Sequence, residues 1–100
     1  MKKVILSADG DSVIYSVPDE VADNLKEFCM EFCDKWLHTS PQAEKYRTER
    51  GVCYNESDFI EYLNEYVFPD QKSTLVKNIG WTMLGESVPE EYRSYPYFNF

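Results

Sequence analysis

Residues 16–38 read SVPDEVADNLKEFCMEFCDKWLH, and this stretch decides the fold because the other predicted elements must pack around it. Its apolar residues recur every three or four positions, as on one face of an α-helix. Pro18 suits a first helical turn, Ser16 precedes it as a candidate N-cap, and acidic residues follow near the positive end of the helix dipole. We therefore predict a continuous helix over residues 16–38, roughly 30 Å long.

The apolar arc of this helix is wider than one packing surface requires. At about 100° per residue it spans roughly 200°, whereas a helix on a single sheet face buries about a third of its circumference. We therefore expect packing on two sides, by a sheet and by other helices. The arc consists of Val21, Ala22, Leu25, Phe28, Cys29, Met30, Phe32, Cys33, Trp36 and Leu37.

Two β-branched, apolar segments, residues 3–8 and 12–17, precede the helix and flank an Asp-Gly pair at positions 9 and 10. Asp-Gly is a strong signal for a type I′ turn, and a two-residue loop fixes the register of a hairpin. That register places Leu6 opposite Val13 and Val4 opposite Tyr15. The face that carries these four residues is the more apolar one, so we expect it to contact the long helix.

Three further elements follow the long helix. Residues 41–50 predict a short polar helix that Gly51 ends, with Ala43 and Tyr46 facing inward. Residues 57–68 predict a second major helix, capped by Asn55 or Ser57, whose inner face holds Phe59, Ile60, Leu63, Tyr66 and Val67. Residues 73–79 predict a third strand, which pairs with either of the first two, and Gly80 marks a bulge or its end.

The end of the chain predicts less regular structure. Gly85 and Pro89 bracket a turn, residues 89–92 suit one helical turn, and residues 93–100 form an aromatic tail that we expect to pack on the core. The element order β-β-α-α-α-β predicts a single α+β domain over residues 1–100, in which helices cover one face of a small antiparallel sheet.

The composition indicates one folded domain with a strong acidic excess. No segment approaches the ~20 apolar residues of a membrane-spanning helix, and the apolar run after the first three residues is too short for a signal peptide, so we expect a cytoplasmic protein. The net charge of −8 disfavours direct binding to nucleic acids and anionic membranes, which depends on Lys and Arg. It either serves solubility alone or steers a basic protein partner.

The three cysteines are the candidates for a thiol or metal site. Cys29 and Cys33 are one helical turn apart, but both lie on the apolar arc, where a free cysteine packs as a small hydrophobe. A structural zinc site uses four ligands; Cys53 supplies a third, and His38 projects from the opposite side of the helix. We expect reduced thiols, no cofactor and no metal, and no catalytic role for His38, the single candidate base.

Two surfaces are candidates for binding a partner. One is acidic, because no basic residue occurs from Val52 to Gln71 and the outer face of the long helix is acidic as well. The other is the aromatic tail, since aromatic side chains are favoured interface anchors. The candidate residues are Glu27, Glu31, Asp34, Glu56, Asp58, Glu61, Glu65, Tyr95, Tyr97 and Phe98.

These observations favour a non-enzymatic, acidic, intracellular protein-binding module. One form is an inhibitor or immunity-type protein that masks a basic target. Two alternatives remain open on the sequence. The first is a small thiol- or metal-dependent regulator that uses Cys29, Cys33 and Cys53. The second is a homo-oligomeric accessory domain, such as a homodimer.

Overall fold

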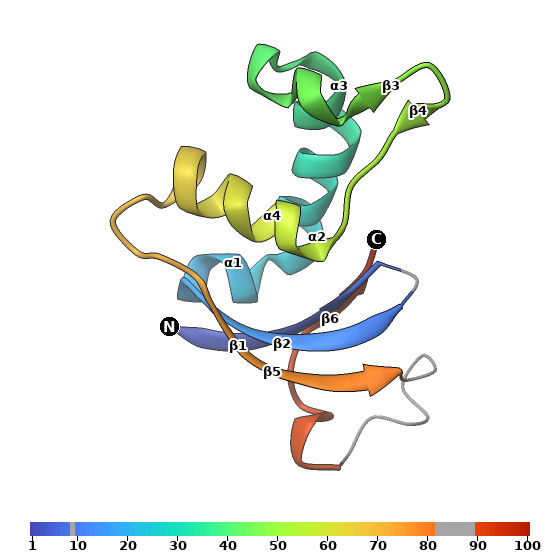
Figure 1. Ribbon diagram of the computed structural model, residues 1–100. Helices are drawn as coiled ribbons and strands as arrows, with labels where there is room; N and C mark the ends of the chain where they lie inside the picture. The colour runs from blue at the N-terminus through green and yellow to red at the C-terminus, as the bar shows by residue number, and fades with distance from the viewer. Residues whose placement is uncertain (9, 82–89) are drawn as a thin grey trace.

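The N-terminal hairpin forms the centre of the sheet in the computed structural model, which describes residues 1–8, 10–81 and 90–100. Strands β1 (Lys2–Ser7) and β2 (Asp11–Val17) pair antiparallel (Figure 1). Their register places Val4 opposite Tyr15 and Leu6 opposite Val13, which confirms the predicted pairing. The predicted type I′ turn includes residue 9, which lies outside the described residues.

Two further strands complete a four-stranded sheet in the order β5-β2-β1-β6. β5 (Thr74–Trp81) pairs antiparallel with β2, which confirms the third predicted strand with shifted bounds and identifies its partner. β6 (Tyr97–Asn99) comes from the aromatic tail and pairs parallel with β1. The sheet is therefore mixed, and the prediction of an antiparallel sheet is wrong in this respect. The predicted turn between Gly85 and Pro89 lies outside the described residues.

Strand β5 is an irregular edge strand. Its register against β2 shifts twice, which leaves Val76 and Ile79 as extra residues on β5. Gly80 follows the second irregularity with a φ of +78°, a conformation that favours glycine, in agreement with the bulge predicted there. Bulges of this kind bend a strand and increase its twist.

The long helix begins later than predicted and is interrupted. β2 continues to Val17, so the predicted N-cap at Ser16 is wrong, and the first helix begins after Pro18, whose ψ of 145° is extended. Asn24, with φ −133° and ψ 41°, separates α1 from the rest. α1 lies along the sheet, and the following segments rise away from it (Figure 1). The segments are α1 (Asp19–Asp23), α2 (Leu25–Met30), the π-helical η1 (Glu31–Trp36) and α3 (Leu37–Thr39).

The predicted helix over residues 41–50 is correct only in its first half. The 3-10 helix η2 (Pro41–Tyr46) is followed by a small hairpin of β3 (Arg47–Thr48) and β4 (Gly51–Val52). Gly51 has a φ of +123°, so it serves the hairpin rather than a helix end. Ala43 and Tyr46 are buried, as predicted.

The second major helix consists of α4 (Glu56–Tyr62) and the π-helical η3 (Leu63–Val67). Asn55 caps it in a capping box, because its side chain accepts the N–H of Asp58 at 3.2 Å and its N–H donates to the Asp58 carboxylate at 2.9 Å. The predicted inner face is wrong at Tyr66, which is 47% exposed, while Tyr62 is buried. The short 3-10 helix η4 (Glu90–Tyr92) confirms the helical turn predicted before the tail.

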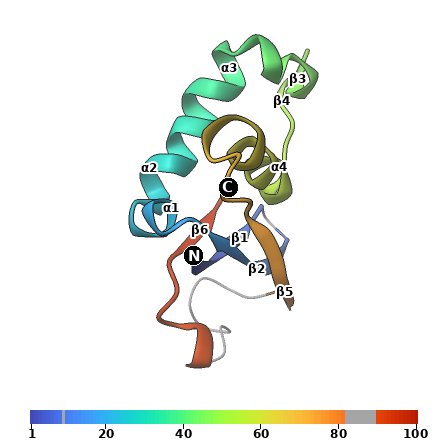
Figure 2. The ribbon, with the colours of Figure 1, turned by 90° about the vertical axis from the view of Figure 1, so that its left-hand side faces the viewer.

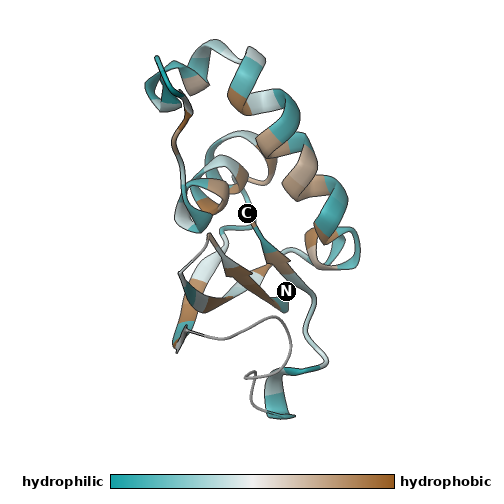
Figure 3. Cartoon of the chain, turned by 90° about the vertical axis from the view of Figure 1, so that its right-hand side faces the viewer, coloured by the Kyte–Doolittle hydropathy of each residue, from teal (hydrophilic) through white to brown (hydrophobic). Residues whose placement is uncertain are grey.

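The main core lies between the helical layer and the face of the sheet that carries Val4 and Leu6, as predicted (Figure 2). Phe32 is fully buried at its centre. The helices carry polar and apolar residues on opposite sides, visible as alternating teal and brown in Figure 3. Met30 departs from the predicted apolar arc, since it is 37% exposed. A second, smaller cluster on the other face of the sheet contains Ile5, Ile14, Ile79, Tyr92, Tyr95 and Tyr97.

Candidate protein-binding surface

The helical layer carries nearly all of the net negative charge. Residues 19–72, which form this layer and its connections, contain 13 acidic and six basic residues, or −7 of the total −8. Within the described residues of this layer, two lysines pair with its acids: Lys35 with Glu31 at 3.4 Å and Lys45 with Glu61 at 3.6 Å. Both pairs are solvent-exposed, so they neutralise little of the surface potential.

The acids of the long helix do not form the continuous strip that a regular helix would produce. The break at Asn24 turns α1 toward the sheet, where Asp23 accepts a hydrogen bond from the Lys2 ammonium at 2.7 Å. Glu27, Glu31 and Asp34 remain exposed on α2 and η1. These three predicted residues are therefore available to a partner, and the acids of α1 belong to a different part of the surface.

The four predicted acids of α4 and η3 have different surroundings. Glu56 lies near Tyr15, whose pKa is raised by burial and further by this carboxylate. Asp58 belongs to the capping box, and Glu61 pairs with Lys45. Glu65 is exposed and has no basic partner in the described part of the chain. The seven predicted acids thus surround the helical layer rather than form one compact cluster.

A half-buried tryptophan and an exposed tyrosine lie in contact where η1 meets η3. The ring centroids of Trp36 and Tyr66 are 5.3 Å apart, and Tyr62 packs beneath them, 4.9 Å from Trp36. Burial, and then the charge of Glu31, raises the pKa of Tyr62, which places that carboxylate nearby. The sequence did not identify this pair, because Tyr66 was assigned to the buried face of a regular helix.

The π-helical turns explain this misassignment. In both helices a backbone N–H reaches a carbonyl five residues back: Phe68 donates to Leu63 at 2.7 Å, and Leu37 donates to Phe32. Each wider turn rotates the residues after it relative to an α-helix. A periodicity of 3.6 residues therefore assigns Tyr66 to the wrong side, and nothing local in the sequence signals a π turn.

The aromatic residues of the tail are held inside the fold. Tyr95 and Tyr97 pack on the outer cluster around Ile5, and the Tyr97 hydroxyl shares a hydrogen bond with Ser7 Oγ at 3.1 Å. Phe98 packs on the main core, 4.9 Å from the ring of Phe100. The tail residues therefore pack as part of the sheet. Binding of a partner by these aromatic residues remains a prediction.

The cysteines occupy three different environments. Cys29 is fully buried, and burial raises the pKa of its thiol. Burial and the neighbouring Asp34 carboxylate raise the pKa of the half-buried Cys33, while Cys53 is exposed. In residues 1–8, 10–81 and 90–100, no three or more His, Cys, Asp or Glu side chains are grouped as metal ligands. Buried thiols with raised pKa values are poor nucleophiles.

Comparison of the chain with known protein families, with curated proteins and with solved structures gives no match. No helix in the part of the chain that the structure describes has both the length and the apolar character to cross a bilayer.

Proposed function

We propose that the protein is a non-enzymatic, acidic, intracellular module that binds a basic protein partner through its helical layer. One form of this function is inhibition, in which the acidic surface masks a basic active site or nucleic-acid channel, as an immunity-type protein would. The observation that carries the proposal is the unequal distribution of charge. The helical layer has a net charge of −7, and the remainder of the chain is nearly neutral.

A charge imbalance of this kind favours association with a partner of opposite sign. Complementary charges steer the encounter and raise the association rate, and the effect weakens as salt screens the charges. Glu27, Asp34 and Glu65 are the best candidates for this role, because all three are exposed and lack a basic partner among the described residues. The exposed Tyr66 ring next to Glu65 offers an aromatic surface on which an arginine or lysine side chain can stack.

The test is affinity capture from an extract of the source organism, with the protein as immobilised bait. We expect recovery of a basic protein at low salt and its release at high salt. The variant E27K/E65K should reduce the association rate by about tenfold or more, because it reverses two unpaired charges on the binding layer. The matched control is E90K/E91K, which makes the same change in net charge at two exposed residues of η4, on the opposite side of the sheet.

Three results would contradict the proposal. Capture of no basic protein, or binding that is insensitive to salt, would show that complementary charge does not drive binding. An equal loss of binding in both double variants would show that binding depends on the total charge of the protein and not on the charges of the helical layer. Circular dichroism of each variant, measured before capture, separates a loss of binding from a loss of fold.

A further inference from the structure

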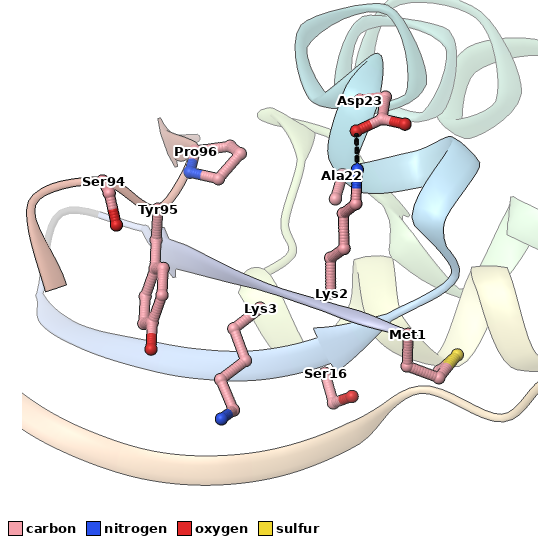
Figure 4. Close-up of a pocket in the computed structure, with 9 residues that line it drawn as sticks. All are labelled: Met1, Lys2, Lys3, Ser16, Ala22, Asp23, Ser94, Tyr95 and Pro96. Atoms are coloured by element: carbon pink, nitrogen blue, oxygen red, sulfur yellow. Dashed lines mark hydrogen bonds and ion pairs between the residues drawn. The ribbon is translucent and has the colours of Figure 1, made fainter.

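A recess in the described surface lies at the open edge of β1, and its lining does not include Glu27, Asp34 or Glu65. It has a volume of about 480 Å³ and lies between the start of β1, the end of α1 and the turn that precedes β6 (Figure 4). A volume in this range suits a small-molecule ligand. Its lining includes Lys3, Ser16, Ser94, Tyr95 and Pro96.

The recess exists because Pro96 ends the pairing between β6 and β1. The parallel ladder begins at Ile5, whose N–H donates to the Pro96 carbonyl at 2.8 Å. One further step would require the backbone nitrogen of Pro96 to donate to the Lys3 carbonyl, and proline has no N–H. The chain turns away instead, and the Tyr95 N–H donates to Tyr92 at 3.1 Å. The edge of β1 at Lys3 is therefore left uncovered.

Three donor groups lie on one side of this edge. Lys3 and Ser16 are directly paired across β1 and β2, so their side chains share a face of the sheet. Figure 4 shows the Lys3 ammonium, the Ser16 hydroxyl and the Tyr95 phenol extending to the same side of β1. An ammonium and two hydroxyls can all donate hydrogen bonds to the oxygens of an anion.

The charge inside the recess is positive, although the protein as a whole is acidic. Lys2 extends to the opposite side of β1, where its ammonium is 2.7 Å from the Asp23 carboxylate, so these two charges offset each other. The Lys3 ammonium has no hydrogen-bond or ion-pair partner in the described part of the chain. Lys3 is therefore the unbalanced charge of the recess.

Tyr95 and Pro96 supply apolar surface to the recess. The Tyr95 ring is half-buried and packs against Tyr92, with ring centroids 5.8 Å apart, in the cluster that covers Ile5 and Ile14. Pro96 has a rigid ring. A flat, apolar group can pack against these side chains while an attached anion reaches the donors.

We propose that this recess binds a small organic anion, a carboxylate or phosphate ester attached to a flat apolar group. Lys3 supplies the counter-charge, Ser16 and Tyr95 donate hydrogen bonds, and Tyr95 and Pro96 contact the apolar group. The site is independent of the proposed binding of a basic protein, because its donors lie on β1, on β2 and in the turn before β6 rather than on the helical layer.

The experiment is an NMR titration of the backbone amides with phenyl phosphate, compared with inorganic phosphate and with phenol. We expect saturable shifts confined to residues around Lys3, Ser94 and Tyr95, with phenyl phosphate bound more tightly than either fragment. K3Q should weaken the binding of phenyl phosphate roughly tenfold, because it removes a charged donor. K77Q is the matched control, an equal loss of charge on an exposed residue of β5 whose side chain faces the same side of the sheet.

Tyr95→Phe is a second variant that retains the packing ring. It should weaken the binding of phenyl phosphate by a few fold, while the spectrum outside the recess stays unchanged. The proposal fails if the recess residues do not shift, or if K77Q weakens binding as much as K3Q does. It also fails if phosphate and phenyl phosphate bind equally, with shifts at every lysine, since this outcome is general ion binding.

Discussion

Phe32 is the residue on which the packing of the helical layer depends. Its ring contacts Trp36 and Tyr62 within the layer, Phe59 on α4, Tyr54 in the preceding connection and Phe100 at the end of the chain. The side chain is fully buried, so no solvent can compensate for a lost contact. A single ring thus joins segments that are distant in the sequence.

Truncation of this ring should be costly. Phe32→Ala is expected to lower the free energy of unfolding by about 3–5 kcal/mol, because the surrounding rings cannot collapse fully into the cavity. Urea denaturation measures the change through the midpoint at constant slope. Phe28→Ala provides the comparison, since Phe28 is only half-buried and its ring lies tilted against that of Phe68, with centroids 6.0 Å apart. Equal losses in the two variants would contradict this account.

The three thiols should react with very different rates. Cys53 is exposed, whereas Cys29 and Cys33 are wholly and partly buried with raised pKa values. With Ellman's reagent we expect one fast thiol in the native protein, which Cys53→Ser abolishes, and reaction of Cys29 only after unfolding. Several equally fast thiols would instead support a thiol-dependent regulator.

At the scale of elements, β5 is an edge strand that resists pairing with another chain. Its two bulges distort the edge, and Lys77 places a charge near its middle. Bulges and edge lysines are common protections against strand addition. Without these protections, the exposed side chains of Leu75 and Val76 would favour association of this edge with another chain.

We therefore expect a monomer at micromolar concentration, and K77V should increase self-association. Sedimentation velocity distinguishes the monomer from the self-associated protein. K26V is the control, because it makes the same substitution at an exposed position of α2, away from a strand edge. A stable dimer of the unmodified protein would contradict the protective role of the bulges and would favour the homo-oligomeric accessory domain.

The elements that the sequence predicted well are those specified by local signals. Alternating apolar residues indicate the β1–β2 register, and Asn55 together with Asp58 marks the start of α4. β6 has no such signal, since its three residues pair with β1 more than 90 positions away. The break at Asn24 and both π turns were likewise missed, because packing rather than propensity determines them.

The candidate surface was predictable as a set of residues but not as an arrangement. Charge alone identifies Glu27, Glu31 and Glu65 as acidic surface positions. The position of the Trp36–Tyr66 rings beside them depends on how η1 packs on η3. Such contacts join two helices separated by a hairpin, and no periodicity within either helix encodes them.

For the whole molecule, buried tyrosines should set the alkaline limit of stability. Burial is the main cause of the raised pKa values of Tyr15, Tyr46, Tyr54 and Tyr62. In the unfolded chain a tyrosine ionises near pH 10, at about its ordinary pKa. Because the folded pKa values are higher, their contribution to stability is complete below about pH 10 and is lost as pH rises through the folded values.

Stability should accordingly fall above about pH 10, with each buried tyrosine adding at most about 1.4 kcal/mol per pH unit to the slope. Tyr62→Phe is expected to reduce this slope, as measured by urea denaturation at a series of alkaline pH values. Tyr66→Phe is the control at an exposed position. An unchanged slope in Tyr62→Phe would show that other groups control alkaline unfolding.

The parallel pairing of β1 with β6 has a mechanical consequence. A force applied between residues 1 and 100 pulls the beginning of one strand and the end of its parallel neighbour in opposite directions, along the strands. The bonds from Ile5 to Pro96 at 2.8 Å and from Phe100 to Ser7 at 2.9 Å then bear the load together, in shear. Antiparallel neighbours pulled from adjacent ends would instead open one bond at a time. The parallel pairing of β1 with β6 is therefore expected to resist stretching of the sheet.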